Sequence, residues 1–254
     1  MKWYKADLHI HSVLSPCGSL EMSPKAVIKK AKEEKLDIIA ITDHNSLLNC
    51  PAYSYYAAKE NIFFINGVEI QTSEEIHIIA LFPNWEIAEK FNDVLYKSLL
   101  PIANDPEFFG DQVVVDKDEN IIKFLETALI NSSIWTYEET IQKIEEYEGI
   151  YFPAHINASN YSVLSQLGFV PKIPKLYATE IILKESYENF IKNNPKFSEL
   201  NLLTNSDAHY LKDIANAFSY FYLDRLTLKN IFSLIKKNNK KKYIKNGRKD
   251  VSHL

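Results

Sequence analysis

Short, largely apolar stretches alternate along this chain with longer stretches in which apolar residues recur at helical spacing. Residues 4–11 alternate between polar and apolar types and predict a strand, while the continuous apolar run at 37–42 is typical of a parallel strand buried on both faces. Between them, Ser23 and Pro24 have the residue types of an N-cap and a first helical position, and predict a helix to about residue 36. The alternation continues to a last predicted helix at 228–237.

The middle of the chain follows the same pattern, with one irregular region. The capping box Thr136-x-x-Glu139 marks a helix start. From about 85 to 135 the pattern is less regular, and 101–120 is predicted as a loop or excursion that holds a short strand at 112–115. Further strands are predicted at 62–65, 68–70, 75–81, 150–152, 178–183 and 201–204, and further helices at 54–60, 85–99, 136–147 and 187–193.

This order of elements predicts a parallel α/β architecture, either a closed barrel or an open sheet. The 254 residues suit one large α/β domain or two small ones, and a hydrophobic content of 46% supplies a core. No linker rich in proline, glycine and serine divides the chain. We therefore expect a single domain over residues 1–254.

Composition and charge narrow the classes of function. A net charge of −4 gives no global basic field for nucleic acid, and the two cysteines, Cys17 and Cys50, form no disulfide framework and predict a reducing compartment. The N-terminus lacks the apolar run of a signal peptide, and no window approaches the roughly 18 apolar residues of a membrane helix. Neither GxGxxG nor GxxxxGK[ST] is present. A cytoplasmic protein without a membrane partner is expected.

Six of the seven histidines lie in or directly after a predicted strand. In parallel α/β folds, functional groups gather at the carboxyl ends of strands, so these side chains are expected to meet. In His9-Ile10-His11, the strand period of two places both imidazoles on one face. Together with two carboxylates in similar positions, the candidate metal ligands are His9, His11, His44, Glu69, His77, His155, Asp207 and His209.

This set of nitrogen and carboxylate donors suits Zn²⁺, Mn²⁺ or Fe²⁺. Eight ligands are too many for one ion, so two or three ions bridged by a carboxylate are expected. Each residue also has an ordinary explanation: polar strand faces are common, a lone histidine such as His77 commonly lies in a core or at its rim, and Asp43 could cap a turn. The ordinary explanation must hold separately at every strand, so the joint pattern favours a metal centre.

The order of these motifs resembles the PHP superfamily (polymerase and histidinol phosphatase). The resemblance covers nearly the whole chain and is weakest from about 85 to 135. It implies a distorted (β/α)7, TIM-like barrel that holds up to three metal ions at its carboxyl-end mouth and hydrolyses phosphate esters. The matching residues are Asp7–Ser12, Ile41–His44, Gly67–Glu69, His77, His155 and Ser206–His209.

The resemblance also implies how the ligands divide among the ions. Many family members supply a further Asp or His soon after the HxHS motif, where this chain has Ser15–Gly18. Cys17 is therefore either a thiolate ligand, which favours zinc, or a small turn residue. Asp7 and Asp43 each either orient a neighbouring imidazole or act as a cap. The implied groups are His9, His11, Glu69 and Asp207 for one ion, Glu69, His77 and His155 for a second, and His44 and His209 for a third.

The mechanistic hypothesis is attack by a metal-activated hydroxide. Two or three cations would lower the pKa of a bridging water, position the hydroxide in line with phosphorus and neutralise the phosphate oxygens. No side-chain nucleophile is needed, and no GxSxG elbow or catalytic thiol context is present. Asp207 or His209 could carry a proton to the leaving group, in competition with metal ligation.

The expected substrate is a small phosphorylated metabolite, a nucleotide or an oligonucleotide end. Residues 236–249 carry eight Lys or Arg. A solvated helix end and tail explains these basic residues better than a site for a polyanion does, so nucleic acid is not the favoured partner. Lys25, Lys184 and Arg225 are other candidate phosphate-binding cations, and 101–120 is either a substrate-selecting lid or a loop without a role. No oligomeric state follows from the sequence.

Two other classes of function stay open. One is a catalytically weak metal-binding or regulatory PHP domain, in which the replacement at 15–18 has cost activity. The other is a metallohydrolase that acts on a non-phosphate ester or an amide. Such enzymes usually hold a carboxylated lysine between their metals, and no strand-end lysine stands in that setting here.

Overall fold

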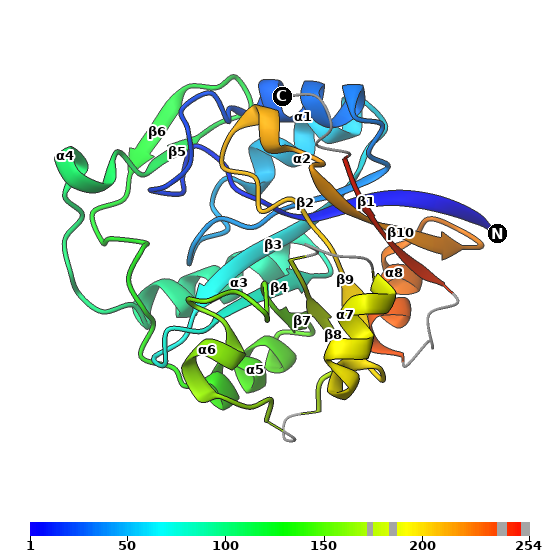
Figure 1. Cartoon of the computed structure of the whole chain (residues 1–254). Helices are drawn as coiled ribbons and strands as arrows, with labels where there is room; N and C mark the ends of the chain where they lie inside the picture. The colour runs from blue at the N-terminus through cyan, green and yellow to red at the C-terminus, as the bar shows by residue number, and fades with distance from the viewer. Residues whose placement is uncertain (172–174, 183–186, 238–242, 250–254) are drawn as a thin grey trace.

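A curled sheet of seven hydrogen-bonded strands forms the centre of the fold (Figure 1). The computed structural model describes residues 1–171, 175–182, 187–237 and 243–249. β1, β2 and β3 run parallel, and the other neighbours in the sheet pair antiparallel. In spatial order the strands are β11 (Ile244–Arg248), β10 (Ala217–Leu223), β1 (Lys2–Ile10), β2 (Ile38–Ile41), β3 (Phe63–Gln71), β4 (His77–Phe82) and β7 (Ile150–Pro153).

A second parallel pair, β8 (Ala178–Glu180) and β9 (Asn201–Leu203), follows the last strand of the sheet. The hydroxyl of Thr179 donates to the carbonyl of Pro153 at the end of β7. Beyond β9 the chain returns to β1, where Ile10 forms a parallel bridge with Ala208. The sheet therefore curls so that the carboxyl ends of its parallel strands face the segment that follows β9.

The observed fold is mixed α/β with a curled sheet, which confirms the predicted class in part. The predicted parallel arrangement holds only for β1–β2–β3 and β8–β9. β4 pairs antiparallel with β3 because the connection between Gln71 and His77 is too short for a crossover helix. No strand was predicted where β10 and β11 lie, and the two predicted strands at 62–65 and 68–70 form the single strand β3.

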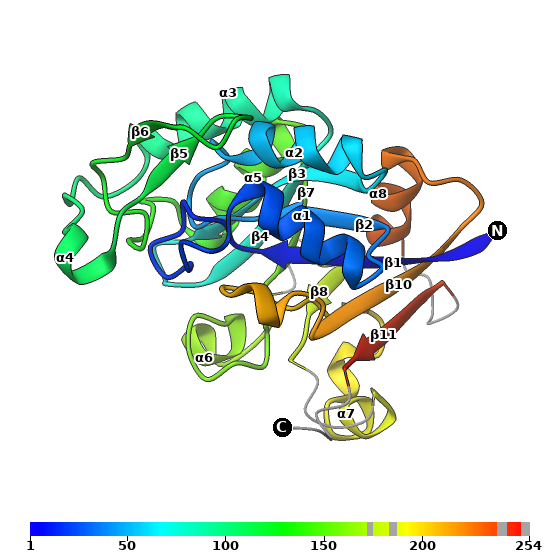
Figure 2. The ribbon, with the colours of Figure 1, turned by 90° about the horizontal axis from the view of Figure 1, so that it is seen from above.

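Helices cover the sheet and bury the apolar positions that predicted them. Figure 2 shows α1 (Pro24–Glu33), α2 (Cys50–Lys59) and α3 (Trp85–Lys97) on one side of the sheet. The capping box at Thr136 is present and begins α5. None of the described helices is long and apolar enough to cross a bilayer. The remaining helices are α4 (Pro106–Phe109), α5 (Tyr137–Glu146), α6 (Val163–Leu167), α7 (Tyr187–Asn193) and α8 (Leu228–Lys236), with 3₁₀ turns η1 (Pro195–Phe197) and η2 (Leu211–Asp213).

The irregular region contains more structure than its sequence pattern predicts. The short strand expected at 112–115 is present as β5 (Val113–Val115). It pairs with β6 (Ile121–Phe124), which was not predicted because its side chains are exposed. The side chain of Asn49 joins this hairpin to the body of the protein, since it donates to the carbonyl of Val113 and to the hydroxyl of Ser12.

Gly67 leaves space for two neighbouring strands at the centre of the sheet. A Cβ at this position would lie 2.7 Å from Cγ2 of Thr42 and 2.9 Å from Cδ2 of Leu81. Both of these side chains are fully buried, so neither has room to move away.

We expect Gly67→Ala to lower the free energy of unfolding by about 1–3 kcal/mol through overpacking. Adding Thr42→Ser, which removes the methyl group but keeps the hydroxyl that faces Ile10, should recover part of this loss. Urea denaturation of the single and double variants measures both effects. A Gly67→Ala protein as stable as the parent chain would contradict the packing assigned here.

Candidate metal centre

All eight predicted site residues lie at one edge of the curled sheet. His9 and His11 come from the end of β1, and Glu69 from the end of β3. His77 begins β4 at the same edge, because this strand runs antiparallel to β3. His44 forms a parallel bridge with Glu69 directly after β2. His155, Asp207 and His209 follow β7 and β9.

A β-bulge in β1 helps to aim its two histidines. The register against β2 passes from Asp7–Ile39 to Ile10–Ile41, so β1 carries one extra residue over this interval. Bulges of this kind bend a strand and redirect its side chains. Both imidazoles are fully buried, and their Nε2 atoms lie 3.2 Å apart.

The carboxylate of Glu69 lies at the centre of the cluster and is faced by five imidazole rings. Its side chain is only 1% exposed. Oε1 lies 2.9 Å from Nδ1 of His77, 3.3 Å from Nε2 of His9 and 3.4 Å from Nε2 of His155. Oε2 lies 3.1 Å from Nδ1 of His44 and 3.4 Å from Nε2 of His11.

Asp207 provides a second carboxylate at the open side of the cluster. Its Oδ1 lies 3.2 Å from Nε2 of His9 and 3.1 Å from Nε2 of His11. The backbone at Asp207 is left-handed, with φ of 51°, which is a turn conformation rather than a continuation of β9. This turn directs one carboxylate oxygen at two imidazoles that come from the opposite end of the sequence.

Hydrogen bonds on the outer nitrogens fix the tautomers of four rings. Nδ1 of His9 bonds the carboxylate of Glu180 at 2.9 Å, and Nδ1 of His209 bonds the backbone carbonyl of Asp207 at 2.8 Å. Nε2 of His77 bonds the amide oxygen of Gln71 at 3.1 Å. These oxygens only accept, so each outer nitrogen carries the proton and the other nitrogen presents a lone pair to the cluster.

His11 obeys the same rule through Ser15. The Ser15 hydroxyl donates to Oδ1 of Asp43 at 2.6 Å, so its oxygen accepts from Nδ1 of His11 at 2.9 Å. The same oxygen accepts from the backbone N–H of His44. Asp43 therefore acts on His11 through a serine rather than by direct contact with an imidazole.

Glu180 is the buried orienting carboxylate that the sequence analysis missed. Besides His9, it accepts from the backbone N–H of His155 at 3.1 Å and from the side chain of Asn205 at 3.1 Å. The sequence indicates this role only through the position of Glu180, an acidic residue inside the apolar strand pattern at 178–183. Asp7, which the sequence analysis named with Asp43 as a residue that could orient an imidazole, has a different role. It accepts from the backbone N–H groups of Ser206 and Ala215 and positions the turn that carries Asp207.

Burial and mutual charge pull the pKa values in the cluster apart. Burial alone would lower the pKa of His9, but the charges of Asp207, Glu180 and Glu69 hold it well above its ordinary value. Burial would raise the pKa of Glu69, yet the surrounding histidines hold it well below its usual range. Burial and the nearby histidines lower the pKa of His44 well below the ordinary value, and burial and His11 lower that of His209 to about 4.

The donor set fits divalent cations. Nδ1 of His44, Nδ1 of His77 and Oε1 of Glu69 are buried and have no hydrogen-bond partner within the described parts of the chain. Unsatisfied buried polar atoms are costly unless an ion or a proton compensates them. Converging lone pairs and carboxylate oxygens are the ligands that Zn²⁺, Mn²⁺ and Fe²⁺ accept.

The model of the PHP domain family matches residues 7–201, about three quarters of the chain. The chain belongs to the PHP family. Asp207 and His209 lie beyond the matched residues, and the structure brings them to the same cluster.

Three solved structures are similar to this chain in fold. Endonuclease Q from Pyrococcus furiosus, a lesion-specific endonuclease, superposes with a TM-score of 0.66 and 19% identity over 92% of this chain and 56% of that one. Endonuclease Q in complex with a 27-mer duplex that carries an abasic lesion gives 0.65 and 18%, over 92% and 57%. A Bifidobacterium adolescentis protein, described provisionally as a metal-dependent phosphoesterase, gives 0.53 and 16%, over 81% and 87%.

A sequence relative from Methanocaldococcus jannaschii, the uncharacterized protein MJ1587, is 35% identical over 92 residues. The aligned part covers 33% of this chain and 53% of the relative. The matched parts of this chain therefore span little more than half the length of MJ1587 and of endonuclease Q.

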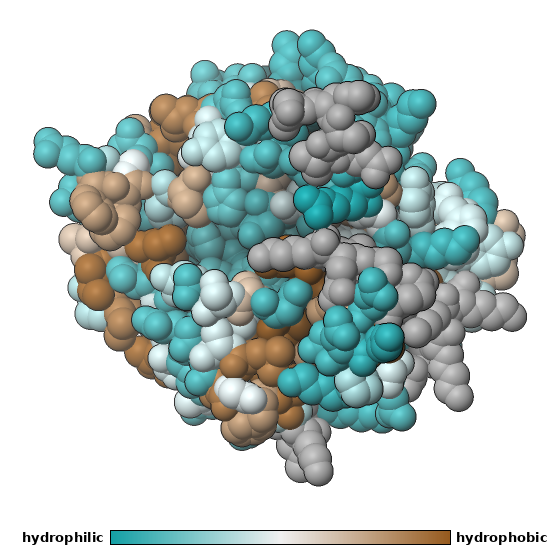
Figure 3. Space-filling model, viewed as in Figure 1, coloured by the Kyte–Doolittle hydropathy of each residue, from teal (hydrophilic) through white to brown (hydrophobic). Residues whose placement is uncertain are grey.

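Figure 3 shows a hydrophilic hollow near the middle of the face, with apolar patches on the side of α4. Asp207 and His209 give the cluster its more accessible side, with side chains 42% and 25% exposed. Two exposed tyrosines lie beside residues of the cluster. Tyr161 stacks on His77 with ring centroids 4.8 Å apart, and Tyr210 follows His209.

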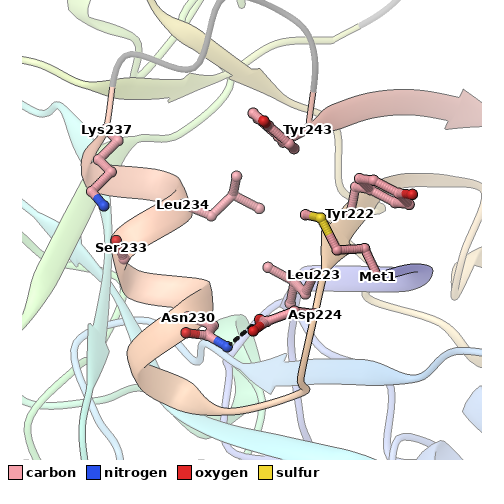
Figure 4. A pocket seen from close by; sticks show the side chains of 9 residues that line it. All are labelled: Met1, Tyr222, Leu223, Asp224, Asn230, Ser233, Leu234, Lys237 and Tyr243. Atoms are coloured by element: carbon pink, nitrogen blue, oxygen red, sulfur yellow. Dashed lines mark hydrogen bonds between the residues drawn. The ribbon is translucent and has the colours of Figure 1, made fainter.

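A separate pocket lies between Met1, the end of β10 and α8 (Figure 4), where Asp224 accepts from Asn230. None of the cluster residues lines that pocket.

The opposed pKa shifts give a direct prediction for the metal-free protein. After chelation, His9 should keep its proton above pH 6.5, whereas His209 should lose its proton near pH 4. Imidazole ¹⁵N chemical shifts followed with pH measure both. Glu180→Gln should lower the pKa of His9, since it removes a charge that favours the protonated ring. Two rings that titrate together at an ordinary histidine pKa would contradict this arrangement.

Glu180 should also matter for metal affinity. Glu180→Gln weakens the orientation of His9 and the basicity of its Nε2, and we expect the affinity for Zn²⁺ or Mn²⁺ to fall roughly 10–100-fold. Calorimetric titration of the chelated protein gives the change, with Glu89→Gln on the exposed side of α3 as the matched control. If both variants bound the metal with equal affinity, the role assigned to Glu180 in the metal centre would be contradicted.

Proposed function

We propose that this PHP domain is a metal-dependent phosphoesterase whose two or three divalent ions are held around Glu69. The observation that carries the proposal is the set of imidazole lone pairs that converge on a buried carboxylate. Among the described residues, the ion pairs of Glu69 are all with histidines, so no lysine or arginine occupies the place of a cation there.

The proposed division of ligands follows the three groups expected from the family pattern. Glu69 is shared by the first two groups, since its Oε1 faces His9 of the first group and His77 of the second. Asp207 belongs to the first group because its Oδ1 lies near both His9 and His11. The groups are His9, His11, Glu69 and Asp207; Glu69, His77 and His155; and His44 and His209.

When bound, divalent ions would neutralise phosphate oxygens and lower the pKa of a coordinated water. The chain's own residues fix the ligands, through Glu180 behind His9 and Gln71 behind His77. Asp207 and His209 were also predicted to carry a proton. The pKa of Asp207 is held well below its usual range despite burial, mainly by His9 and by a hydrogen bond from His11, and His209 is neutral at pH 7. We therefore propose both first as metal ligands.

For the substrate, we propose a phosphodiester of nucleic acid, with a small phosphorylated metabolite as the alternative. Exposed Tyr161 and Tyr210 beside the cluster can stack against bases, and the similar endonuclease Q acts on DNA. This departs from the expectation that nucleic acid is not the favoured partner, an expectation that the comparisons do not support. Among the candidate cations, Arg225 lies beyond β10 at the far end of β1, and Lys184 lies outside the described residues.

The test is hydrolysis by the metal-loaded protein. Reloading the chelated protein with Mn²⁺ or Zn²⁺ should restore cleavage of bis-p-nitrophenyl phosphate and of DNA oligonucleotides, intact or with an abasic site. Glu69→Gln should lower the rate by more than about 100-fold, because even changes behind a ligand cost roughly 10–100-fold. Glu89→Gln is the control and should retain the parental rate.

The possible outcomes test the substrate, the catalytic activity and the metal centre separately. Cleavage of p-nitrophenyl phosphate without cleavage of diesters would favour the small metabolite. Metal binding without turnover of any ester would favour a regulatory PHP domain over an enzyme. Turnover that survives Glu69→Gln would contradict the proposed centre itself.

A further inference from the structure

The loop after His11 brings Cys17 back to the metal centre. Gly18 donates to the carbonyl of Ser15 at 2.8 Å, in a turn where a Cβ on Gly18 would lie 2.4 Å from the carbonyl oxygen of Ser12. The backbone N–H of Ser19 donates to the carbonyl of His209 at 2.9 Å. This hydrogen bond holds the loop against the segment that carries His209, which lies far along the chain from Cys17.

Cys17 joins a compact group of ligand atoms. One donor atom each of His11, Cys17, His44 and His209 lies within 4.8 Å of all the others. In a tetrahedral zinc site, ligand atoms lie about 3.3–3.6 Å apart, given Zn–N near 2.0–2.1 Å and Zn–S near 2.3 Å. The group is a slightly expanded form of such a site.

The neighbours of Cys17 have lone pairs available for a cation. Nδ1 of His209 donates to a backbone carbonyl, so its Nε2 is free to ligate. His44 is 5% exposed, and its Nδ1 is buried without a hydrogen-bond partner in the described chain. His11 has one available nitrogen, which lies between both carboxylates, Glu69 and Asp207, whereas Nδ1 of His44 lies 3.1 Å from Glu69 alone. Three ligands then remain for a separate ion: Cys17, His44 and His209.

The side chain of Cys17 does not behave as a packing residue. It is exposed, whereas Cys50 is buried in the core, and neither forms a disulfide. A small apolar turn residue would be expected to bury its sulfur, as Cys50 does. The position of Cys17 at the open side of the cluster is instead that of a ligand with room for a fourth, exchangeable partner.

We propose that Sγ of Cys17 is a metal ligand and that Cys17, His44 and His209 form a third, zinc-selective site. This rests on the proposed metal centre and adds a thiolate where the family pattern has a carboxylate or an imidazole. Sulfur and imidazole ligands favour Zn²⁺ over the harder Mn²⁺, so this site discriminates between the two ions. The ions around Glu69 are bound by nitrogen and oxygen alone.

Cobalt substitution tests the ligand directly. The chelated full chain, titrated with Co²⁺, should show a thiolate-to-cobalt charge-transfer band in the near ultraviolet as the last equivalent binds. Cys17→Ser should lose this band and the last equivalent. Cys17→His and Cys17→Asp should keep the equivalent without the band. Cys50→Ala should keep both, since its sulfur lies away from the cluster.

The outcomes distinguish the two proposals. A chain that binds no cobalt contradicts the proposed metal centre. A chain that binds cobalt with no charge-transfer band, or whose band and stoichiometry survive Cys17→Ser, overturns the role of Cys17 and leaves the centre around Glu69 intact.

A second readout needs no variant. Of the two thiols only Cys17 is exposed, so reaction with DTNB under native conditions reports on it alone. Desolvation and the charges of Glu69 and Asp207 raise the pKa of the Cys17 thiol to about 12, so the metal-free reaction is slow and is followed at alkaline pH. Zinc at saturation should slow this reaction at least about tenfold, because a coordinated thiolate is no longer a free nucleophile. Manganese should leave the rate unchanged. Equal rates with zinc and without metal would contradict the assignment.

Discussion

A buried carboxylate surrounded by imidazole rings is the constraint on which the rest of the structure depends. Removing Glu69 from water costs several kcal/mol unless a positive charge compensates it. The outer hydrogen bonds of His9 and His77 place protons away from Glu69 and lone pairs toward it. Lone pairs beside carboxylate oxygens repel unless a proton or a cation lies between them. A metal centre satisfies the carboxylates and the lone pairs together, whereas protons satisfy them only by charging the buried rings.

The fold is arranged to assemble this cluster from distant parts of the chain. The parallel strands β1, β2 and β3 end at one edge, and the short hairpin to β4 returns His77 to the same edge. The left-handed turn at Asp207, held by Asp7, closes the site from the opposite end of the sequence. Asp7 is buried and accepts from the backbone N–H groups of Ser206 and Ala215, so it holds this turn against β1.

Sequence patterns predicted the parts of this structure that depend on local order. Strand period and the position of each motif after an apolar run were enough to predict that His9, His11 and Glu69 gather at one edge of the sheet, and the capping box at Thr136 begins a helix as expected. The division of the ligands among ions came from the resemblance to the PHP superfamily. The pairing of β10 with β1 and the direction of β4 depend on contacts between distant strands, which local periodicity does not encode. Glu180 was missed for the same reason: its role is defined by the histidine it reaches, not by its own neighbours in sequence.

The most direct test of the account is where metal ions bind. Crystals of the full chain soaked in Zn²⁺ or Mn²⁺, with diffraction data collected on both sides of the metal absorption edge, give the ion positions by anomalous scattering. We predict at least two peaks that share the carboxylate of Glu69, one of them in contact with His9 and Asp207. A map with no peak beside Glu69, or with peaks only at surface carboxylates, would contradict it.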